Sequence, residues 1–419
     1  MNMYKGMLLT MVLMSSLSAQ AISLKECHQM AHDNYPAIKQ YQMLDQSRDF
    51  TLENVAKGWL PQVSASAGAY AFTDMMKQNA QMQQMGMDMK NVVASASVMV
   101  RQNVYDGGQM AAQKKVASAQ TEVQKKQLDV SMYSINERID QLYFGILLLD
   151  EQLSQNHLLQ KDLSTSEKTI RSMMKGGIAN QSDLDAILVE KVKSQQQEES
   201  LKASRLSYLR MLSIFVGKEI RVDETLEKPS LVEGTNIGSS TLANQRPELS
   251  YYISQNQLLD AQRKQLDTRL RPTVSLFGMG MFHSKVSDMV NNGLLLSGVS
   301  VSWNIGALYT RKNDIRKLEV QRQMNESERT TFLFNNRLQN EEASGTIASL
   351  RKQLVQDDEI IRLRESIRSK SDKKVQLGTE SVNELVRDIN AVSMARTQKA
   401  QHEILLLKEI YQQKYINNN

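Results

Sequence analysis

The chain has few of the residues and motifs on which many protein classes depend. Cys27 is the only cysteine among its 419 residues, which excludes an intrachain disulfide framework. Beyond residue 21, no stretch reaches the roughly 18 uninterrupted apolar residues that a transmembrane helix needs. There is no nucleophile–base constellation, no phosphate-binding glycine loop and no H-E-x-x-H motif. These absences argue against an enzyme and against a bound cofactor.

Neither sign of charge dominates the sequence. The 51 basic and 46 acidic residues are interspersed, so there is no basic stripe of the kind that binds nucleic acid. We therefore expect no nucleic-acid partner.

Two groups of side chains have residue types that bind metals. His28 and His32 stand four residues apart beside Cys27 on an expected helix, where both histidines could ligate zinc, but no fourth ligand is near. Six methionines between residues 73 and 91 could bind Cu(I). Because the chain has 24 methionines in all, a flexible methionine-rich loop explains this segment better. We expect surface histidines and no metal site.

Proline is also scarce, and four of the five prolines form two matched pairs. Pro36 and Pro61 are 25 residues apart, as are Pro247 and Pro272, so the second pair follows the first at an offset of 211 (247 − 36). A period of this length exceeds the roughly 20–50 residues of a solenoid repeat. The spacing therefore indicates a duplicated domain.

The chain is expected to divide into four segments. Residues 1–21 have the features of a secretory signal, with Lys5, an apolar run and Ala19-Gln20-Ala21 as a small-x-small cleavage site. We expect the first repeat at residues 22–217, a linker at 218–242 and the second repeat at 243–419.

Long stretches without proline predict long helices. Residues 109–175 hold one glycine and no proline, and no proline follows Ala307. In the first stretch an unbroken heptad seam requires a partner helix to bury it. The seam consists of Leu128, Met132, Ile135, Ile139, Leu142, Ile146, Leu149 and Leu153. The second repeat keeps only a looser seam.

A glycine-containing turn interrupts each helical run. The turns occupy residues 174–182 and 375–383, and their glycines, Gly177 and Gly378, are 201 residues apart (378 − 177). Glycine at such a place ends a helix in the left-handed conformation. We expect Ser182 and Asn383 to cap the helices that follow. Each repeat should therefore contain a helical hairpin.

Segments of alternating polarity precede each helical hairpin. They predict β-hairpins over residues 62–105 and 273–306. Alternation over about ten residues is typical of membrane strands, but membrane barrels have at least about 8 strands and open edges do not occur in lipid. If these four strands lie in a membrane, several chains must combine them, and three chains would supply twelve.

Several short motifs follow one another in a recognisable order. They are Asn34-Tyr35-Pro36, Trp59-Leu60-Pro61, Val104-Tyr105-Asp106-Gly107-Gly108, Arg246-Pro247-Glu248-Leu249 and the two glycine turns. In this order they resemble the TolC-like outer-membrane efflux proteins over nearly all of the chain beyond residue 21. The resemblance implies a mainly α fold with a small membrane β-barrel contribution. Each repeat would carry a strand hairpin and a long helical hairpin, and three chains would form an α/β-barrel duct.

The resemblance also implies a location and partners. The chain would lie in the outer membrane of a Gram-negative bacterium, in contact with outer-membrane lipid, with a large periplasmic portion. As a homotrimer it would be the exit duct of a tripartite efflux pump or a type I secretion system. A periplasmic adaptor and an inner-membrane transporter would dock at the tips of the helical hairpins, and the linker would join an equatorial belt.

Two groups of residues are candidates for these roles. The expected docking tips are Lys175, Gly176, Gly177, Ile178 and Ala179 with Leu377, Gly378 and Thr379, where glycine permits close approach and two apolar side chains stand in a turn. In the family, acidic residues six and nine positions after the second tip glycine line the periplasmic aperture.

In this chain the aperture positions hold Glu384 and Arg387, so one acidic residue is replaced by the opposite charge. Asp183, six residues after Gly177, is the matching candidate on the first hairpin. The simpler alternative is that Glu384 only stabilises its helix N-terminus, by about 0.3–1 kcal/mol, or pairs with Arg387 on an exposed surface.

Two other classes of protein remain as alternatives. A soluble periplasmic coiled-coil adaptor or scaffold would explain the helices and the signal segment but not the paired strands. A secreted enzyme would require catalytic residues that the sequence does not display.

Overall fold

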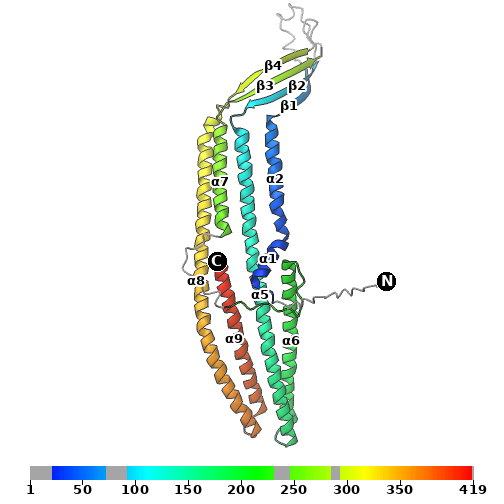
Figure 1. The fold of residues 1–419 in the computed structure, drawn as a ribbon, viewed down its shortest axis with the longest axis vertical. Coiled ribbons are helices and arrows are strands. Elements are labelled where there is room, and N and C mark those ends of the chain that lie inside the picture. The colour runs from blue at the N-terminus through cyan, green and yellow to red at the C-terminus, as the bar shows by residue number, and fades with distance from the viewer. Residues whose placement is uncertain (1–20, 72–91, 231–245, 285–292, 418–419) are drawn as a thin grey trace, which may run out of the picture. The chain divides into compact units, whose positions relative to one another are not determined.

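The computed structural model of the protein describes residues 21–71, 92–230, 246–284 and 293–417. Nearly all of the expected signal segment, the methionine-rich segment 73–91 and the linker beyond residue 230 lie outside the described residues. The helices are α1 (Leu24–Asn34), α2 (Lys39–Ala56), α5 (Gln109–Lys175), α6 (Gln181–Val216), α7 (Pro247–Thr268), α8 (Ala307–Gln376) and α9 (Val382–Asn417), with short 3₁₀ helices at Pro36–Ile38 and Lys57–Trp59. The strands are β1 (Gln62–Ala71), β2 (Val92–Tyr105), β3 (Thr273–His283) and β4 (Gly293–Ser302) (Figure 1). The predicted fold class, mainly α with one small antiparallel sheet, is confirmed.

Two compact units can be distinguished, and each takes segments from both halves of the sequence. Unit 1 comprises the described parts of residues 1–38, 132–244 and 335–419, and unit 2 those of 39–131 and 245–334. The long helices α5 and α8 therefore contribute to both units. The repeat boundaries at residues 217 and 243 stay a prediction.

The prolines mark the beginnings of elements, as expected from their fixed φ angle. Pro247 occupies the first turn of α7, where its missing N–H costs nothing. Pro61 stands directly before β1, and the preceding Leu60 is extended with ψ 155°, as a residue before proline prefers. Because α5 and α8 contain no proline, they continue for 67 and 70 residues.

Unit 2 holds the four-stranded sheet, in the order β1-β2-β3-β4 with every neighbouring pair antiparallel. Strands β1 and β2 lie within residues 62–105, the range expected for the first β-hairpin. The second ends earlier than predicted, because β4 stops at Ser302. Residues 303–306 form a turn in which Ala307 N donates to Asn304 O at 3.3 Å, and the turn preferences of Asn304 and Gly306 outweigh the alternation.

The register of the sheet places an apolar set of side chains on one face. Val63 pairs with Val100, Leu276 with Val299 and Val274 with Val301. The other face carries most of the serines, and Ser66 Oγ lies 2.8 Å from Ser97 Oγ there. The apolar face is the more exposed one: Val63, Phe282, Leu295, Val299 and Val301 are 68, 63, 86, 64 and 68% exposed. Ser97 and Ser300 on the opposite face are half-buried and Ser275 is buried. We call this sheet inverted, because its apolar face is exposed and its serine face is partly covered, the reverse of a sheet that faces water.

Helices in unit 2 are joined in pairs by polar contacts. Tyr41 of α2 donates to Asp129 of α5 at 2.5 Å, and Lys125 of α5 pairs with Asp45 of α2 at 2.7 Å. Asn325 of α8 donates to the carbonyl of Tyr252 in α7 at 2.9 Å. The corresponding helices of the two repeats, α2 and α7, are thus each held against the long helix of their own repeat.

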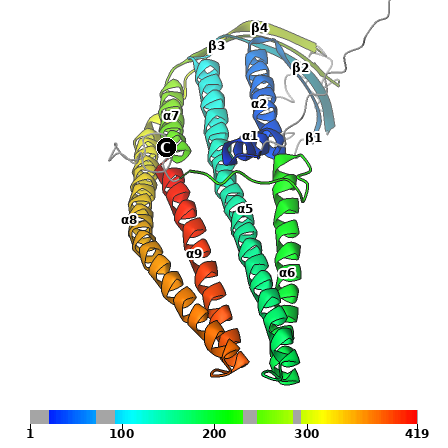
Figure 2. The same cartoon turned by 60° about the horizontal axis from the view of Figure 1, so that its bottom comes forward.

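Unit 1 holds most of the buried apolar side chains. Leu142 and Ile146 of the predicted seam are buried, and Tyr143 and Phe144, which lie outside the seam, are buried as well. In the seam as a whole, the six positions from Leu128 to Ile146 are buried and the last two are half-buried. From the turns at their ends, α6 runs back beside α5 and α9 beside α8, as the second view shows (Figure 2). The two predicted helical hairpins are therefore present.

The first described residues are held against the segment that follows α6. Ile22 forms a parallel bridge with Leu226, and the buried Tyr143 hydroxyl lies 2.8 Å from the carbonyl oxygen of Ile22 and 2.6 Å from that of Glu227. A capping box of Ser23 and Glu26 then starts α1. This arrangement fixes the segment after α6 on the helices of unit 1.

None of the helices among the described residues combines the length and the low polarity needed to cross a bilayer.

Candidate functional site: the two interhelical turns

The turns at the ends of α5 and α8 have the same backbone geometry. In the first, Gly177 has φ +72°, Gly177 N donates to Met174 O at 3.1 Å and Ile178 N to Met173 O at 2.9 Å. In the second, Gly378 has φ +71° and donates to Val375 O at 2.9 Å, and Thr379 N donates to Lys374 O at 2.9 Å. This pair of bonds is the Schellman motif, which satisfies the last carbonyl groups of a helix. The predicted left-handed glycines are confirmed.

The caps of the following helices differ from those predicted. Asn180 caps α6: its Oδ1 accepts from Asp183 N at 3.1 Å, while Asp183 Oδ2 accepts from Asn180 N at 3.0 Å. At α9, Ser381 Oγ accepts from Glu384 N at 3.3 Å. The prediction of Ser182 and Asn383 is wrong, because a capping residue stands three positions before the acidic residue whose N–H it accepts.

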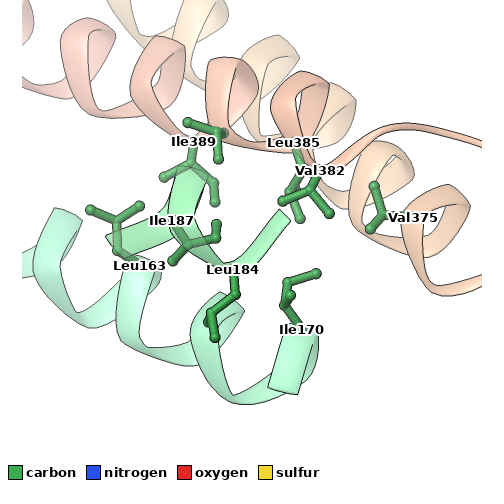
Figure 3. Packing of buried hydrophobic residues seen from close by; sticks show 9 residues of the cluster. Leu163, Ile170, Leu184, Ile187, Val375, Val382, Leu385 and Ile389 are labelled. Carbon is green, nitrogen blue, oxygen red and sulfur yellow. The ribbon is translucent and has the colours of Figure 1, made fainter. Parts of the chain in front are cut away.

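A cluster of nine buried apolar residues lies directly behind the turns (Figure 3). It takes members from all four helices: Leu163 and Ile170 from α5, Leu184 and Ile187 from α6, Val375 from α8, and Val382, Leu385, Val386 and Ile389 from α9. Ala179 packs against it and is half-buried. The cluster holds the two turns beside each other, and a Cβ built on Gly378 would lie 3.7 Å from Ile178 Cγ2.

The other predicted tip residues face outward. Leu377 is 77% exposed and Ile178 is 58% exposed. Lys175, Gly176, Gly177 and Thr379 are exposed as well, and a Cβ on Gly177 would meet nothing within 4 Å. The turns thus present two apolar side chains on a backbone fixed by the Schellman bonds.

Two of the predicted aperture residues form an ion pair, and the third belongs to a helix cap. Glu384 and Arg387 are brought together as an ion pair one turn apart on α9, with the Arg387 side chain 70% exposed and that of Glu384 38% exposed. Asp183 is half-buried and bonds to Asn180 as part of its cap. Asp183 and Glu384 each lie in the first turn of a helix, where a carboxylate is stabilised by the helix dipole.

The residues considered for metal binding have other environments. The Cys27 side chain is fully buried, and burial raises the pKa of its thiol to about 12. His28 Nε2 lies 2.7 Å from Asp140 Oδ1, and His32 is exposed beside Asp33. No group of three or more metal-ligating side chains occurs in the described part of the chain.

Comparison with known proteins gives matches of structure but not of sequence. No protein-family model matches the chain, and no curated protein matches it either. The solved structure of the outer-membrane channel OprN matches over 94% of this chain and 89% of its own, with a TM-score of 0.70 at 14% identity. The chain has the fold of an outer-membrane channel.

Two further channel structures give similar values. CusC, whose structures concern folding and transmembrane channel formation, matches over 94% of this chain and 92% of its own, with a TM-score of 0.68 at 12% identity. The CmeC outer-membrane channel of Campylobacter jejuni matches over 94% and 85%, with a TM-score of 0.66 at 13% identity. At these identities the likeness concerns the fold, and at that level the resemblance seen in the sequence is confirmed.

Within this channel fold, polar contacts near the turns link residues that the sequence analysis did not select. Asp162 of α5 pairs with Arg368 of α8 at 2.7 Å. Asn390 of α9 donates to Glu190 of α6 at 3.0 Å. The partners are 206 and 200 residues apart (368 − 162; 390 − 190), close to the repeat offset of 201, and this offset is the signal that could have found them.

Proposed function

We propose that the protein is the exit duct of an export system in the outer membrane of a Gram-negative bacterium. The observation that carries the proposal is the inverted sheet, whose apolar face is exposed while its serine face is partly covered. In water such a face would be unfavourable at about 25 cal/mol per Å² of apolar surface, whereas lipid removes this cost. The fold match with outer-membrane channels over 94% of the chain supports the same conclusion.

The sheet also supports a homotrimer. In one chain β1 and β4 each pair on one side only, so each leaves an open edge. Open edges do not occur in lipid and membrane barrels have at least about 8 strands, so two chains are the minimum for closure. Three chains joined β4 to β1 would form a closed barrel of twelve strands, in agreement with the family resemblance.

The interhelical turns are proposed as the docking site of a periplasmic adaptor, with an inner-membrane transporter as the third component. Leu377 and Ile178 supply exposed apolar contacts, and the buried cluster behind them holds the surface rigid. Lys175, Gly176, Gly177, Gly378 and Thr379 complete this surface. Ala179 contributes through the cluster, because it is half-buried there.

Glu384 and Arg387 are proposed to line the periplasmic aperture. In a trimer each residue would occur three times around the axis, so its charge would act on every passing ion. The ion pair between them reduces the net charge of the ring to near zero. Asp183 is proposed to stabilise its own turn and to face the aperture from the first hairpin.

Fractionation and mass measurement test the duct. We expect the protein in the outer-membrane fraction, extracted only by detergent, with a mass in mild detergent of three chains. A soluble monomer would contradict the proposal and would favour the alternative of a periplasmic coiled-coil adaptor or scaffold. A choice between a tripartite efflux pump and a type I secretion system would follow from which transporter co-purifies after cross-linking.

A further inference from the structure

Basic side chains gather at the end of unit 1 that carries the two interhelical turns. Residues 161–195 and 362–396, which form the turns and the adjoining helix segments, hold 14 lysines and arginines and 10 acidic residues, a net charge of +4 (14 − 10). The other described residues of unit 1 hold 14 lysines and arginines and 19 acidic residues, a net charge of −5 (14 − 19). The charge of unit 1 is therefore positive at the turns and negative elsewhere.

Four lysines contribute most to this excess, and we call them the turn lysines. Lys370 and Lys373 share one face of α8 with Leu377, because they precede it by seven and four residues. The hydrogen bond from Leu377 N to Lys373 O, at 3.1 Å, continues the helical pattern to Leu377. Lys168 and Lys175, seven residues apart, share a face of α5 in the same way, and Lys175 is its last residue. All four turn lysines are exposed.

The carboxylates near the turns already have partners, whereas the turn lysines do not. Five carboxylates each bond to a residue of their own hairpin: Asp183 to Asn180, Asp185 to Gln181, Asp372 to Gln376, Glu380 to Ser371 and Glu384 to Arg387. None of the turn lysines forms an ion pair with another residue of the described chain. The charge that this surface offers to a partner is therefore positive.

The turn lysines border an apolar centre. Leu377 and Ile178 are 77 and 58% exposed, and the buried cluster behind them holds both turns in place. An apolar centre with a charged rim is the usual arrangement of a protein interface. In such an interface the charges of the rim steer the encounter and select the partner.

We propose that the protein that docks on the interhelical turns presents an acidic surface, with carboxylates around an apolar contact. Its apolar side chains cover Leu377 and Ile178, and its carboxylates pair with the turn lysines. A basic partner is disfavoured, because it would meet four ammonium groups that no carboxylate of this surface balances. The docking role proposed above for the turns is the basis of this assignment.

Site-specific photo-cross-linking of the full-length protein, in the bacterium that produces it, tests the charge of the partner. Benzoylphenylalanine replaces Leu377, where it keeps an apolar side chain, or replaces Ser172, an exposed residue between Lys168 and Lys175. Mass spectrometry then identifies the cross-linked peptide. We expect a protein segment in which Asp and Glu outnumber Lys and Arg. A neutral or basic segment, or cross-links to phospholipid in place of protein, would overturn the proposal.

Charge reversal of three turn lysines tests the pairing itself. The triple variant Lys175→Glu, Lys370→Glu, Lys373→Glu should lower the cross-link yield from position 377 about tenfold or more, at equal amounts of protein in the membrane, and the same three changes to Arg should retain the yield. Lys352→Glu is the matched control, because Lys352 is exposed on α8 but about 38 Å along the helix from Leu377.

The outcomes separate the charge of the partner from docking as such. A wild-type yield in the triple Glu variant would refute the acidic partner and leave docking at the turns intact. No cross-link to a protein from either position would refute docking at the turns, and the acidic partner with it.

Discussion

Leu377 is the more exposed of the two large apolar tip residues, at 77% against 58% for Ile178. The Schellman bonds of the second turn run through the backbone of Gly378 and Thr379, so they do not depend on the Leu377 side chain. A change of the Leu377 side chain should therefore affect the binding of a partner and not the fold.

Leu377→Asp should lower transport at least tenfold in cells while leaving the amount of trimer in the membrane unchanged. The reason is that a charge would replace an exposed apolar contact at the proposed docking surface. Val192→Asp on α6 is a matched control, since Val192 is 55% exposed but lies away from the turn. Transport at the wild-type level in Leu377→Asp would count against adaptor docking there.

Removing Glu384 or Arg387 should shift the ion preference of the channel in opposite directions. Glu384→Ala leaves an unpaired cation and should shift the ion preference of the purified trimer toward anions, and Arg387→Ala should shift it toward cations. Single-channel recording under a salt gradient measures both shifts as reversal potentials. The double variant restores a neutral site and should return to near the wild-type value. Identical reversal potentials in the wild type and the three variants would show that these residues do not line the aperture.

At the scale of the elements, stability measurements at the start of α6 can distinguish the observed cap, Asn180, from the expected one, Ser182. Asn180→Ala should lower the free energy of unfolding by about 1 kcal/mol, because Asp183 N loses its acceptor. Asn180→Ser keeps a capping oxygen and should recover most of this loss. Ser182→Ala should change stability by less than about 0.5 kcal/mol. Denaturant titration of the three variants measures these differences, and an effect at Ser182 as large as at Asn180 would contradict the assigned cap.

The elements show how far sequence could predict this fold. The bounds of α5 and the start of α8 follow from proline, glycine and heptad spacing, because these signals are local. The caps were misassigned although the signal was present: Asn180 and Asp183, like Ser381 and Glu384, have the three-residue spacing of a capping box. The end of β4 at Ser302 was missed because alternation continues into the turn that follows it.

The contacts near the site depend on pairings between the repeats. Leu184 and Leu385 both lie in the buried cluster and are 201 residues apart (385 − 184), so corresponding positions of the repeats meet. The repeat offset was visible in the sequence, but which helix faces pack together depends on three-dimensional geometry that periodicity alone does not specify. For the ion pair of Asp162 and Arg368, which are 206 residues apart (368 − 162), the offset indicates the region of contact but not the two partners.

For the molecule as a whole, the inverted sheet makes adjacent residues of β4 respond differently to the same charge. Val299 is 64% exposed on the apolar face, and Ser300 is half-buried on the opposite face. If the apolar face meets lipid, Val299→Lys should destabilise the inserted protein by about 2–4 kcal/mol near the bilayer midplane, and Ser300→Lys by much less. The amount of heat-resistant trimer in outer-membrane fractions measures this difference. Equal losses in the two variants would mean that the apolar face does not lie in lipid.

The inverted sheet also has a consequence for the chain before it is inserted and assembled. A newly exported chain would carry an exposed apolar surface bordered by the open edges of β1 and β4, which is the combination that leads to edge-to-edge aggregation. In an aqueous compartment the chain therefore requires a chaperone that covers the sheet. Overproduction of the chain beyond the amount of this chaperone should yield insoluble chains whose helices are intact.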